Sequence, residues 1–219
     1  MDLLFGATEL LGTVAFAVSG AMLAVKKRLD IFGILFLGVV TALGGGTIRD
    51  LLLGHTPPRM FYNVEYILVA LLSALTVFFA IRLTHGQGLW SGNAADTLLT
   101  FSDALGLGIF AVIGTQAGIA DGFGDNAVLC IFVGMVTGVG GGVLRDMMCA
   151  DIPFVLRKHI YAVAALVGAG VYYFLCRLGV SSGISSMLGM SCTVVLRILA
   201  WHYRWNLPKA QNPQETKSI

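Results

Sequence analysis

The sequence is poor in charge: only 12% of its 219 residues are Asp, Glu, Lys or Arg, whereas 57% are hydrophobic. A soluble domain usually carries about 25% charged residues. The mean hydropathy of +0.83 therefore excludes an ordinary soluble domain, and the net charge of +2 gives no reason to expect nucleic-acid binding. This composition is typical of a polytopic membrane protein.

Motifs of catalysis and redox chemistry are also missing. The sequence contains no Ser-His-Asp, H-E-x-x-H or P-loop pattern, so we expect no enzyme, no cofactor and no metal site beyond transient monovalent cations. The four cysteines show no C-x-x-C spacing and are predicted to be small buried hydrophobic residues: Cys130, Cys149, Cys176 and Cys192. The first residues lack the basic region of a cleaved signal peptide, so the first apolar segment is expected to be retained.

Long hydrophobic runs, in contrast, are abundant. A membrane crossing takes about 20 apolar residues, and seven stretches are long enough, near residues 5–25, 31–53, 64–83, 98–119, 127–148, 160–177 and 185–203. Prolines follow the second and fifth stretches, where a helix should stop. The sequence thus predicts an all-α membrane protein with seven transmembrane helices.

An internal repeat organises these segments. The phrase GGGTIRD at residues 44–50 returns 96 residues later as GGGVLRD at residues 140–146, and the segment around Phe16 returns 94 residues later around Phe110. Each copy holds three spans, an odd number, so the second copy must enter from the opposite side. The predicted organisation is a first three-helix repeat (1–83), a linker (84–97), a second, inverted repeat (98–178), a seventh helix (179–204) and a tail (205–219).

The basic residues predict the orientation. One side of the membrane collects Lys26, Lys27, Arg28, Arg82, Arg157, Lys158, Arg204 and Lys209, whereas the other collects little beyond Arg59 and Arg177. The positive-inside rule then puts the N-terminus outside and the C-terminus in the cytoplasm.

The glycine triplets have two interpretations. Glycine is about 1 kcal/mol worse than alanine in a helix interior, so three in a row favour a kink or a short unwound segment whose carbonyls could coordinate a cation. The alternative is tight packing of helices through small residues. We favour the first and predict that these glycines line a pathway and act as its hinge: Gly44, Gly45, Gly46, Gly140, Gly141 and Gly142.

Charged residues flank the triplets in both copies. Glu9 begins the first span and Asp103 begins the fourth, 94 residues later. We predict two symmetry-related pairs, Glu9 with Arg49 at the outer end and Asp103 with Arg145 at the inner end, because ionisable groups inside a membrane usually pair or face water. Either the pairs only hold helices together at the interfaces, or they flank an aqueous path and gate it. Two further carboxylates are expected to cap or pair locally, Asp50 and Asp146.

Other polar residues carry weaker signals. Hydroxyls within the spans could line a pore, although Ser and Thr commonly bond their own helix backbone; these are Ser19, Thr41, Thr47, Thr115 and Thr137. His55 lies in a loop and is expected to be solvated.

Two copies of G-G-G-x-x-R-D, each ending a second helix before a proline, resemble the bacterial membrane proteins named for a "glycine transporter" domain. That family is related to the trimeric intracellular cation (TRIC) channels, and the resemblance covers roughly residues 5–203. It implies two inverted three-helix repeats plus one helix, a homotrimer in the bacterial plasma (inner) membrane, and an hourglass pore inside each protomer. It also implies that the second and fifth helices kink at the glycines and line that pore. The basic lipid-binding motif of animal TRIC proteins has no clear match.

Two functions are compatible with these features. The first is a channel for K⁺ or other monovalent cations, and the second is a secondary carrier of glycine or another small neutral amino acid. The channel is favoured because no additional charged group marks a coupling-ion site at mid-depth. A membrane scaffold that transports nothing is weakened by the inverted symmetry. The expected partners are monovalent cations, membrane lipids and further copies of the chain.

Overall fold

The computed structural model describes residues 2–84, 92–157 and 160–205, in which every regular element is a helix and no strand occurs. Seven long helices are each apolar enough to cross a membrane, which confirms the predicted fold class: α1 (Asp2–Lys26), α2 (Ile31–Leu52), α3 (Val64–Leu83), α4 (Gly92–Gly118), α5 (Ala127–Met148), α7 (Ile160–Arg177) and α8 (Ser182–His202). Three short helices connect them: η1 (Arg59–Phe61), the π-helical η3 (Ile119–Phe123) and α6 (Phe154–Arg157).

The boundaries differ from the predicted ones mainly at α4. This helix begins at Gly92 rather than near residue 98, and η3 extends the same span to Phe123. Parts of three predictions lie outside the described residues: residues 85–91 of the linker, residues 206–219 of the tail, and Lys158 and Lys209 among the basic residues that predict the orientation.

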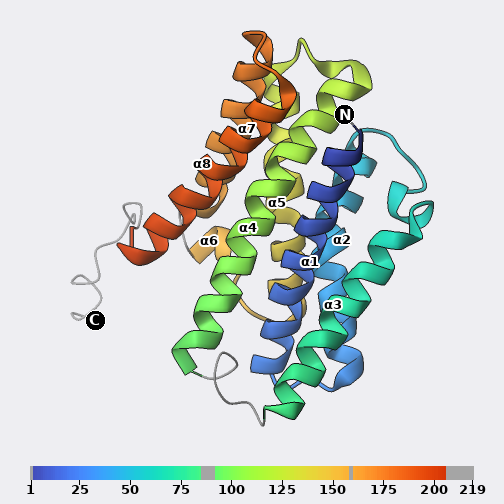
Figure 1. Ribbon diagram of the computed structural model, residues 1–219, viewed down its shortest axis with the longest axis vertical. Coiled ribbons are helices and arrows are strands. Elements are labelled where there is room, and N and C mark those ends of the chain that lie inside the picture. Colours follow the sequence, from blue (N-terminus) through green and yellow to red (C-terminus); the bar gives the residue numbers. More distant parts are fainter. Residues whose placement is uncertain (1, 85–91, 158–159, 206–219) are drawn as a thin grey trace, which may run out of the picture.

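Two copies of the same three-helix arrangement pack against each other in opposite directions. In the first repeat α1 packs on α2 and α3, and in the second α4 packs on α5 and α7. Figure 1 shows α1 and α4 side by side and antiparallel, as the inverted repeat requires. The helix starts also correspond, since Asp30 caps α2 through Gly33 N (2.8 Å) and Asn126, 96 residues later, caps α5 through Leu129 N (3.0 Å).

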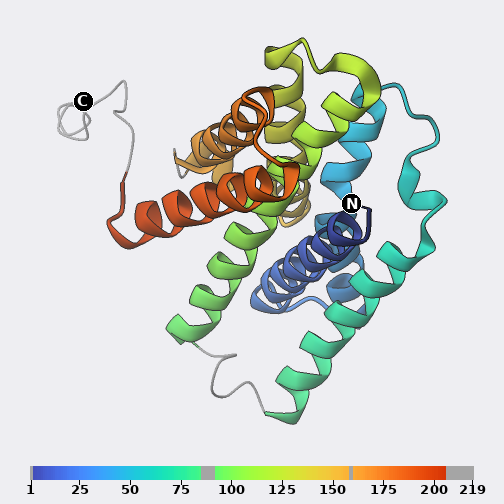
Figure 2. The same ribbon diagram turned by 45° about the horizontal axis from the view of Figure 1, so that its top comes forward.

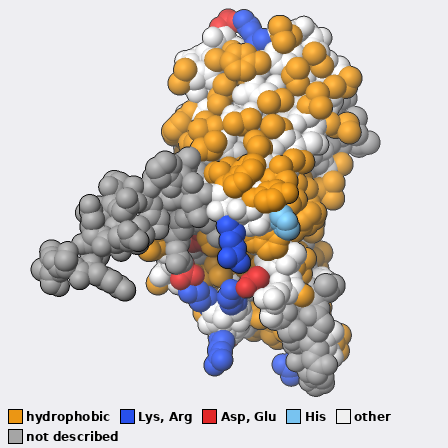
Figure 3. Space-filling model, turned by 90° about the vertical axis from the view of Figure 1, so that its left-hand side faces the viewer, with side chains coloured by type: hydrophobic (Ala, Val, Ile, Leu, Met, Phe, Trp, Pro, Cys, Tyr) orange, Lys and Arg blue, Asp and Glu red, His pale blue; other side chains and the backbone are white. Residues whose placement is uncertain are grey.

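The seventh span stands outside this symmetry. Helix α8 packs on α7 and α4, and Figure 2 shows it on the far side of α4 from α1. The surface in Figure 3 carries a broad apolar area between charged side chains at the upper tip and in the lower part. Such an area suits the hydrocarbon core of a bilayer.

The two glycine triplets meet where α2 crosses α5. A Cβ atom on Gly45 would overlap the carbonyl oxygen of Thr137, and one on Gly141 would overlap the carbonyl oxygen of Thr41. The two contacts are related by the repeat offset, since Gly141 lies 96 positions after Gly45 and Thr137 lies 96 positions after Thr41. The two helix backbones therefore touch twice, about a pseudo-twofold axis, and only glycine permits that approach.

Both helices run through their triplets without a break. The structure assigns one continuous helix to Ile31–Leu52 and another to Ala127–Met148, so the unwound segment with freed carbonyls that we expected is wrong. The intrinsic penalty of glycine is offset here by the close packing of helix on helix, which the propensity argument alone left out. The role of the triplets as hinges stays a prediction.

Neighbouring glycines of one triplet provide a test of this packing. Gly45→Ala should lower the free energy of unfolding by about 1–3 kcal/mol, because the added methyl group meets backbone atoms of α5. Gly46→Ala should be neutral or slightly stabilising, since its Cβ would meet only the Arg49 side chain at 3.7 Å. The measurement is SDS-induced unfolding of the purified protein in detergent micelles. Equal losses for both variants would contradict the packing role of Gly45.

Candidate vestibule and paired charge clusters

A cavity of ≈ 280 Å³ opens between the first repeat and α4. We call it the vestibule. Its wall is formed by α1, α2, η1, α3, α4 and η3, through the following residues: Glu9, Thr13, Ala42, Leu43, Gly46, Arg49, Asp50, Arg59, Met60, Asn63, Tyr66, Phe110, Ile113, Gln116, Ala117 and Ala120. It combines two arginines and two carboxylates with small and apolar residues, so it can hold water and a small charged solute.

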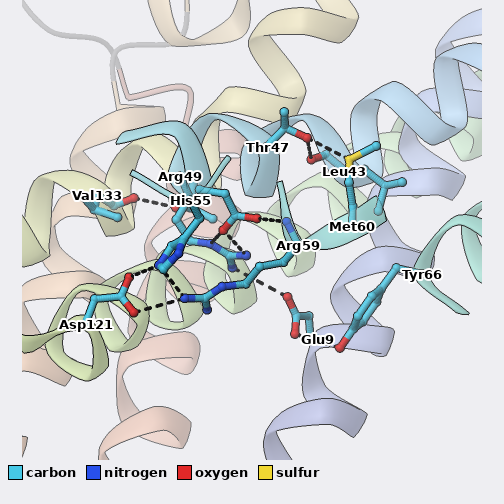
Figure 4. Close-up of polar contacts among 12 residues, drawn as sticks. Glu9, Leu43, Thr47, Arg49, His55, Arg59, Met60, Tyr66, Asp121 and Val133 are labelled. Carbon is cyan, nitrogen blue, oxygen red and sulfur yellow. Dashed lines mark hydrogen bonds and ion pairs between the residues drawn. The ribbon is translucent and has the colours of Figure 1, made fainter. Parts of the chain in front are cut away.

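The first charge cluster lies on the wall of the vestibule (Figure 4). Arg49 Nε donates to Asp50 Oδ1 at 2.9 Å, and Arg49 Nη1 lies 3.7 Å from Glu9 Oε1. The other oxygen of Asp50 accepts the backbone N–H of Arg59 at 2.8 Å, and Tyr66 donates its hydroxyl to Glu9 Oε2 at 3.0 Å. We call these residues the first cluster.

The second cluster repeats this arrangement in the other half. Arg145 Nε donates to Asp146 Oδ1 at 2.9 Å, while Arg145 Nη1 lies 2.7 Å from Asp103 Oδ1 and 2.6 Å from Ser19 Oγ. The second oxygen of Asp146 accepts the backbone N–H of Phe154 at 2.8 Å, as Asp50 accepts that of Arg59. The structure thus brings together both pairs that the repeat predicts, and each adjacent Asp both binds its arginine and holds the following loop.

The two clusters differ in their access to solvent. The side chains of Arg145 and Asp103 are 0% exposed, whereas Arg49 is 7% and Glu9 28% exposed. The shorter contact in the second cluster therefore lies in a dry environment, and the longer one in the first cluster faces the vestibule. The attraction within a buried ion pair offsets the cost of desolvation only with good geometry and further hydrogen bonds, and Arg145 makes such bonds to Ser19 and Asp146.

Side-chain volume explains why only the first cluster adjoins this cavity. Gln116 and Ala117 of α4 line the vestibule. Their counterparts 94 residues earlier are Met22 and Leu23 of α1, which are buried in an apolar core with Leu99. The larger side chains of Met22 and Leu23 fill the space near the second cluster that corresponds to the vestibule beside the first.

A stacked aromatic pair lies where α1 packs on α4. The rings of Phe16 and Phe110, which are 94 residues apart, lie 5.3 Å from centre to centre at an angle of 25°. Phe110 lines the vestibule, and Phe16 precedes Ser19 of the second cluster by one helical turn. Two glycines that are also repeat partners, Gly12 and Gly106, leave room for these rings.

The predicted pore-lining hydroxyls do not line the vestibule. Four of them donate to the carbonyl four residues earlier in their own helix: Thr41 (2.6 Å), Thr47 (2.9 Å), Thr115 (2.8 Å) and Thr137 (2.6 Å). Ser19 instead binds Arg145 in the second cluster.

Several wall residues were missed in the sequence. Tyr66 binds Glu9, and its counterpart 95 residues later, Tyr161, is buried against Gly142 of α5. The repeat offset was the available signal, because both tyrosines follow it. Thr13 is a single polar residue whose place on the wall depends on helix rotation, which no motif indicates.

Known proteins resemble this chain along most of its length. A family model described as "Glycine transporter" matches residues 7–82 and 100–177, one stretch in each repeat. The UPF0126 inner membrane protein YadS of Escherichia coli (strain K12) is 37% identical over 204 residues, covering 91% of this chain and 93% of that protein. A UPF0126 membrane protein of Deinococcus radiodurans is 44% identical over 170 residues, covering 76% and 74%.

Solved structures give the same result. A TRIC trimeric intracellular cation channel orthologue from Rhodobacter sphaeroides superposes with a TM-score of 0.83 at 32% identity, covering 92% of this chain and 99% of that one. A prokaryotic TRIC channel crystallised in 0.5 M KCl superposes with a TM-score of 0.84 at 34% identity, covering 94% and 100%.

Removing one carboxylate from each cluster should give unequal losses of stability. Asp103→Asn leaves Arg145 without its strongest partner in a dry site, so the free energy of unfolding should fall by about 3–5 kcal/mol. Glu9→Gln disturbs a longer, partly hydrated contact and should change it by only about 0–1 kcal/mol. SDS-induced unfolding of both variants in the same detergent measures the difference, and similar losses would show that the clusters are equally buried in solution.

Proposed function

Because the chain belongs to the glycine transporter domain family, which includes UPF0126 membrane proteins and TRIC cation channels, we propose that it is a channel for monovalent cations, with K⁺ as the main ion. The observation that carries the proposal is the line of features along α1 and α4. It runs from the Glu9 carboxylate in the vestibule to the stacked phenylalanine pair, and from there to the second cluster.

Each part of this line has a role in the proposed channel. The vestibule concentrates cations beside Glu9, since a carboxylate in a cleft raises the local concentration of counter-ions. The stacked rings of Phe16 and Phe110 form the apolar barrier, because constrictions without polar groups exclude water and so block ions. The Asp103–Arg145 pair forms the second barrier. With both barriers in place, the conformation described above is a closed state.

Opening requires the helices to move around the α2–α5 crossing. The crossing is the centre of the pseudo-symmetry, and the arginines of the two clusters follow the glycine triplets by three residues in each copy. A rotation of α2 against α5 would shift Arg49 and Arg145 together and open or close both ends. In this proposal the glycine triplets line the path and serve as its hinge.

The first cluster faces the outside in this proposal. The charge bias of the sequence supports an N-terminus outside and a C-terminus in the cytoplasm of the plasma membrane. The names of the TRIC relatives, which describe trimeric channels, support a homotrimer in which every protomer carries its own path.

A carrier for glycine is the second candidate, and one observation favours it. The vestibule presents Arg49 Nη1 and Glu9 Oε1 3.7 Å apart, and such opposite charges would suit the carboxylate and ammonium groups of a small amino acid. Purified protein in a planar bilayer distinguishes the two functions. Discrete single-channel currents carried by K⁺ support the channel, and saturable glycine uptake into liposomes without such currents supports the carrier.

Neutralising the vestibule carboxylate should weaken cation conduction. Glu9→Gln should lower the single-channel K⁺ conductance by about fivefold, the effect of one elementary charge about 4 Å from a cation in water. Glu65→Gln is the matched control, because Glu65 lies exposed at the start of α3 and outside the vestibule wall. Conductance in Glu9→Gln equal to that of the wild type would remove Glu9 from the ion path.

Reducing the aromatic barrier should favour the open state. Phe110→Leu removes the ring stacked on Phe16, so the open probability should rise in single-channel records. Phe36→Leu makes the same change at an exposed position of α2 and should leave the open probability unchanged. An unchanged open probability in Phe110→Leu would place the barrier elsewhere.

A further inference from the structure

A titratable triad lies at the mouth of the vestibule. His55 follows α2, Arg59 lies in η1, and Asp121 lies in η3 of the other repeat (Figure 4). His55 Nε2 lies 2.7 Å from Asp121 Oδ2 and 2.7 Å from Arg59 Nη2, and Arg59 Nη2 donates to Asp121 Oδ1 at 3.1 Å. His55 keeps 37% of its side chain exposed, in line with the predicted solvated position, and it also joins the two repeats.

The two contacts of His55 Nε2 exclude each other. Arg59 can donate to this nitrogen only when it carries a lone pair, which requires a neutral imidazole. Asp121 can accept from it only when it carries a proton. In the imidazolium ion both ring nitrogens are donors, so protonation keeps the bond to Asp121 and removes the bond from Arg59.

The opposite end of the molecule carries the same contact with different residues. Lys27 and Asp151 bind at 2.7 Å; Lys27 lies 94 residues before Asp121, and Asp151 lies 96 residues after His55. Each pair therefore joins corresponding loops of the two repeats. The basic member is lysine at one end, which stays charged at physiological pH, and histidine at the other, whose charge normally changes between about pH 5 and pH 8.

Asp50 of the first cluster also contacts the segment that carries His55 and Arg59. Asp50 accepts the His55 backbone N–H through its carbonyl oxygen at 2.8 Å and holds the backbone N–H of Arg59 through its carboxylate. Beyond Asp50 lie Arg49 and Glu9 of the first cluster. Arg59 lines the vestibule, so its position links the triad to the ion path.

We propose that His55, Arg59 and Asp121 form a proton-binding site that regulates cation flow through the vestibule. The inference rests on the proposed channel function. Protonation of His55 fixes it on Asp121, removes the hydrogen bond that Arg59 donates to it, and adds one positive charge beside Arg59 of the vestibule wall. Acid on the first-cluster side lowers the cation current, and acid on the side of Lys27 and Asp151 does not.

Single-channel recording with independent pH on the two sides tests the site. In the wild type, lowering the pH from about 8 to about 5 on the first-cluster side should reduce K⁺ conductance by about fivefold. His55→Lys should give the reduced conductance at both pH values, because lysine carries the charge throughout. Lys27→His places a histidine in the corresponding pair at the other end, and it should make the K⁺ conductance sensitive to acid on that side. Equal pH dependence in the wild type and His55→Lys would overturn the proposal.

Thermal unfolding in detergent tests the same site without any current. The difference in melting temperature between the wild type and His55→Lys should change between about pH 8 and pH 5, since only the wild type gains a charge there. In an Asp121→Asn background this change should disappear. A difference that does not vary with pH would overturn the proton site, whereas a lack of K⁺ current with the expected melting behaviour would count only against the channel function.

Discussion

The backbone contact between α2 and α5 is the constraint on which the rest of the structure depends. Apolar side chains gain little by leaving lipid for another helix, so helices in a bilayer associate through close packing and polar contacts. Gly45 and Gly141 allow each helix to reach the carbonyl oxygens of the other. That approach fixes the distance and the angle between the repeats, and it sets where the arginine after each triplet can lie.

The same symmetry produces two ends that are not equivalent. Both ends use an arginine held by an adjacent aspartate and by an acidic residue of a neighbouring helix. At one end Met22 and Leu23 fill the space around the charges, and at the other Gln116 and Ala117 leave a cavity. A few changes of side-chain volume thus turn a symmetric fold into one with an open side and a sealed side.

The sequence predicts what depends on pattern and misses what depends on packing. The spans follow from apolar length, and the pairs of Glu9 with Arg49 and Asp103 with Arg145 follow from the repeat offset. The prediction of unwound triplets was wrong because helix propensity treats each helix alone, whereas Gly45 packs against the backbone of Thr137 of another helix. The vestibule was missed because its shape depends on the volumes of residues such as Ala117. The partner of His55 could have been found from the repeat offsets. Asp121 lies 94 residues after Lys27, and Asp151 lies 96 residues after His55, so both pairs join a basic to an acidic residue at corresponding positions.

The contact at the centre of the fold has the form of a homodimer interface. In an isologous contact, residue i of one subunit contacts residue j of its partner, and residue j of the first subunit contacts residue i of the partner. The contacts of Gly45 with Thr137 and of Gly141 with Thr41 satisfy this relation within one chain. A single three-helix unit able to insert in both directions across a bilayer would be complementary to itself at this surface. The folded chain joins two such units covalently, and the join frees each copy to diverge without losing its partner.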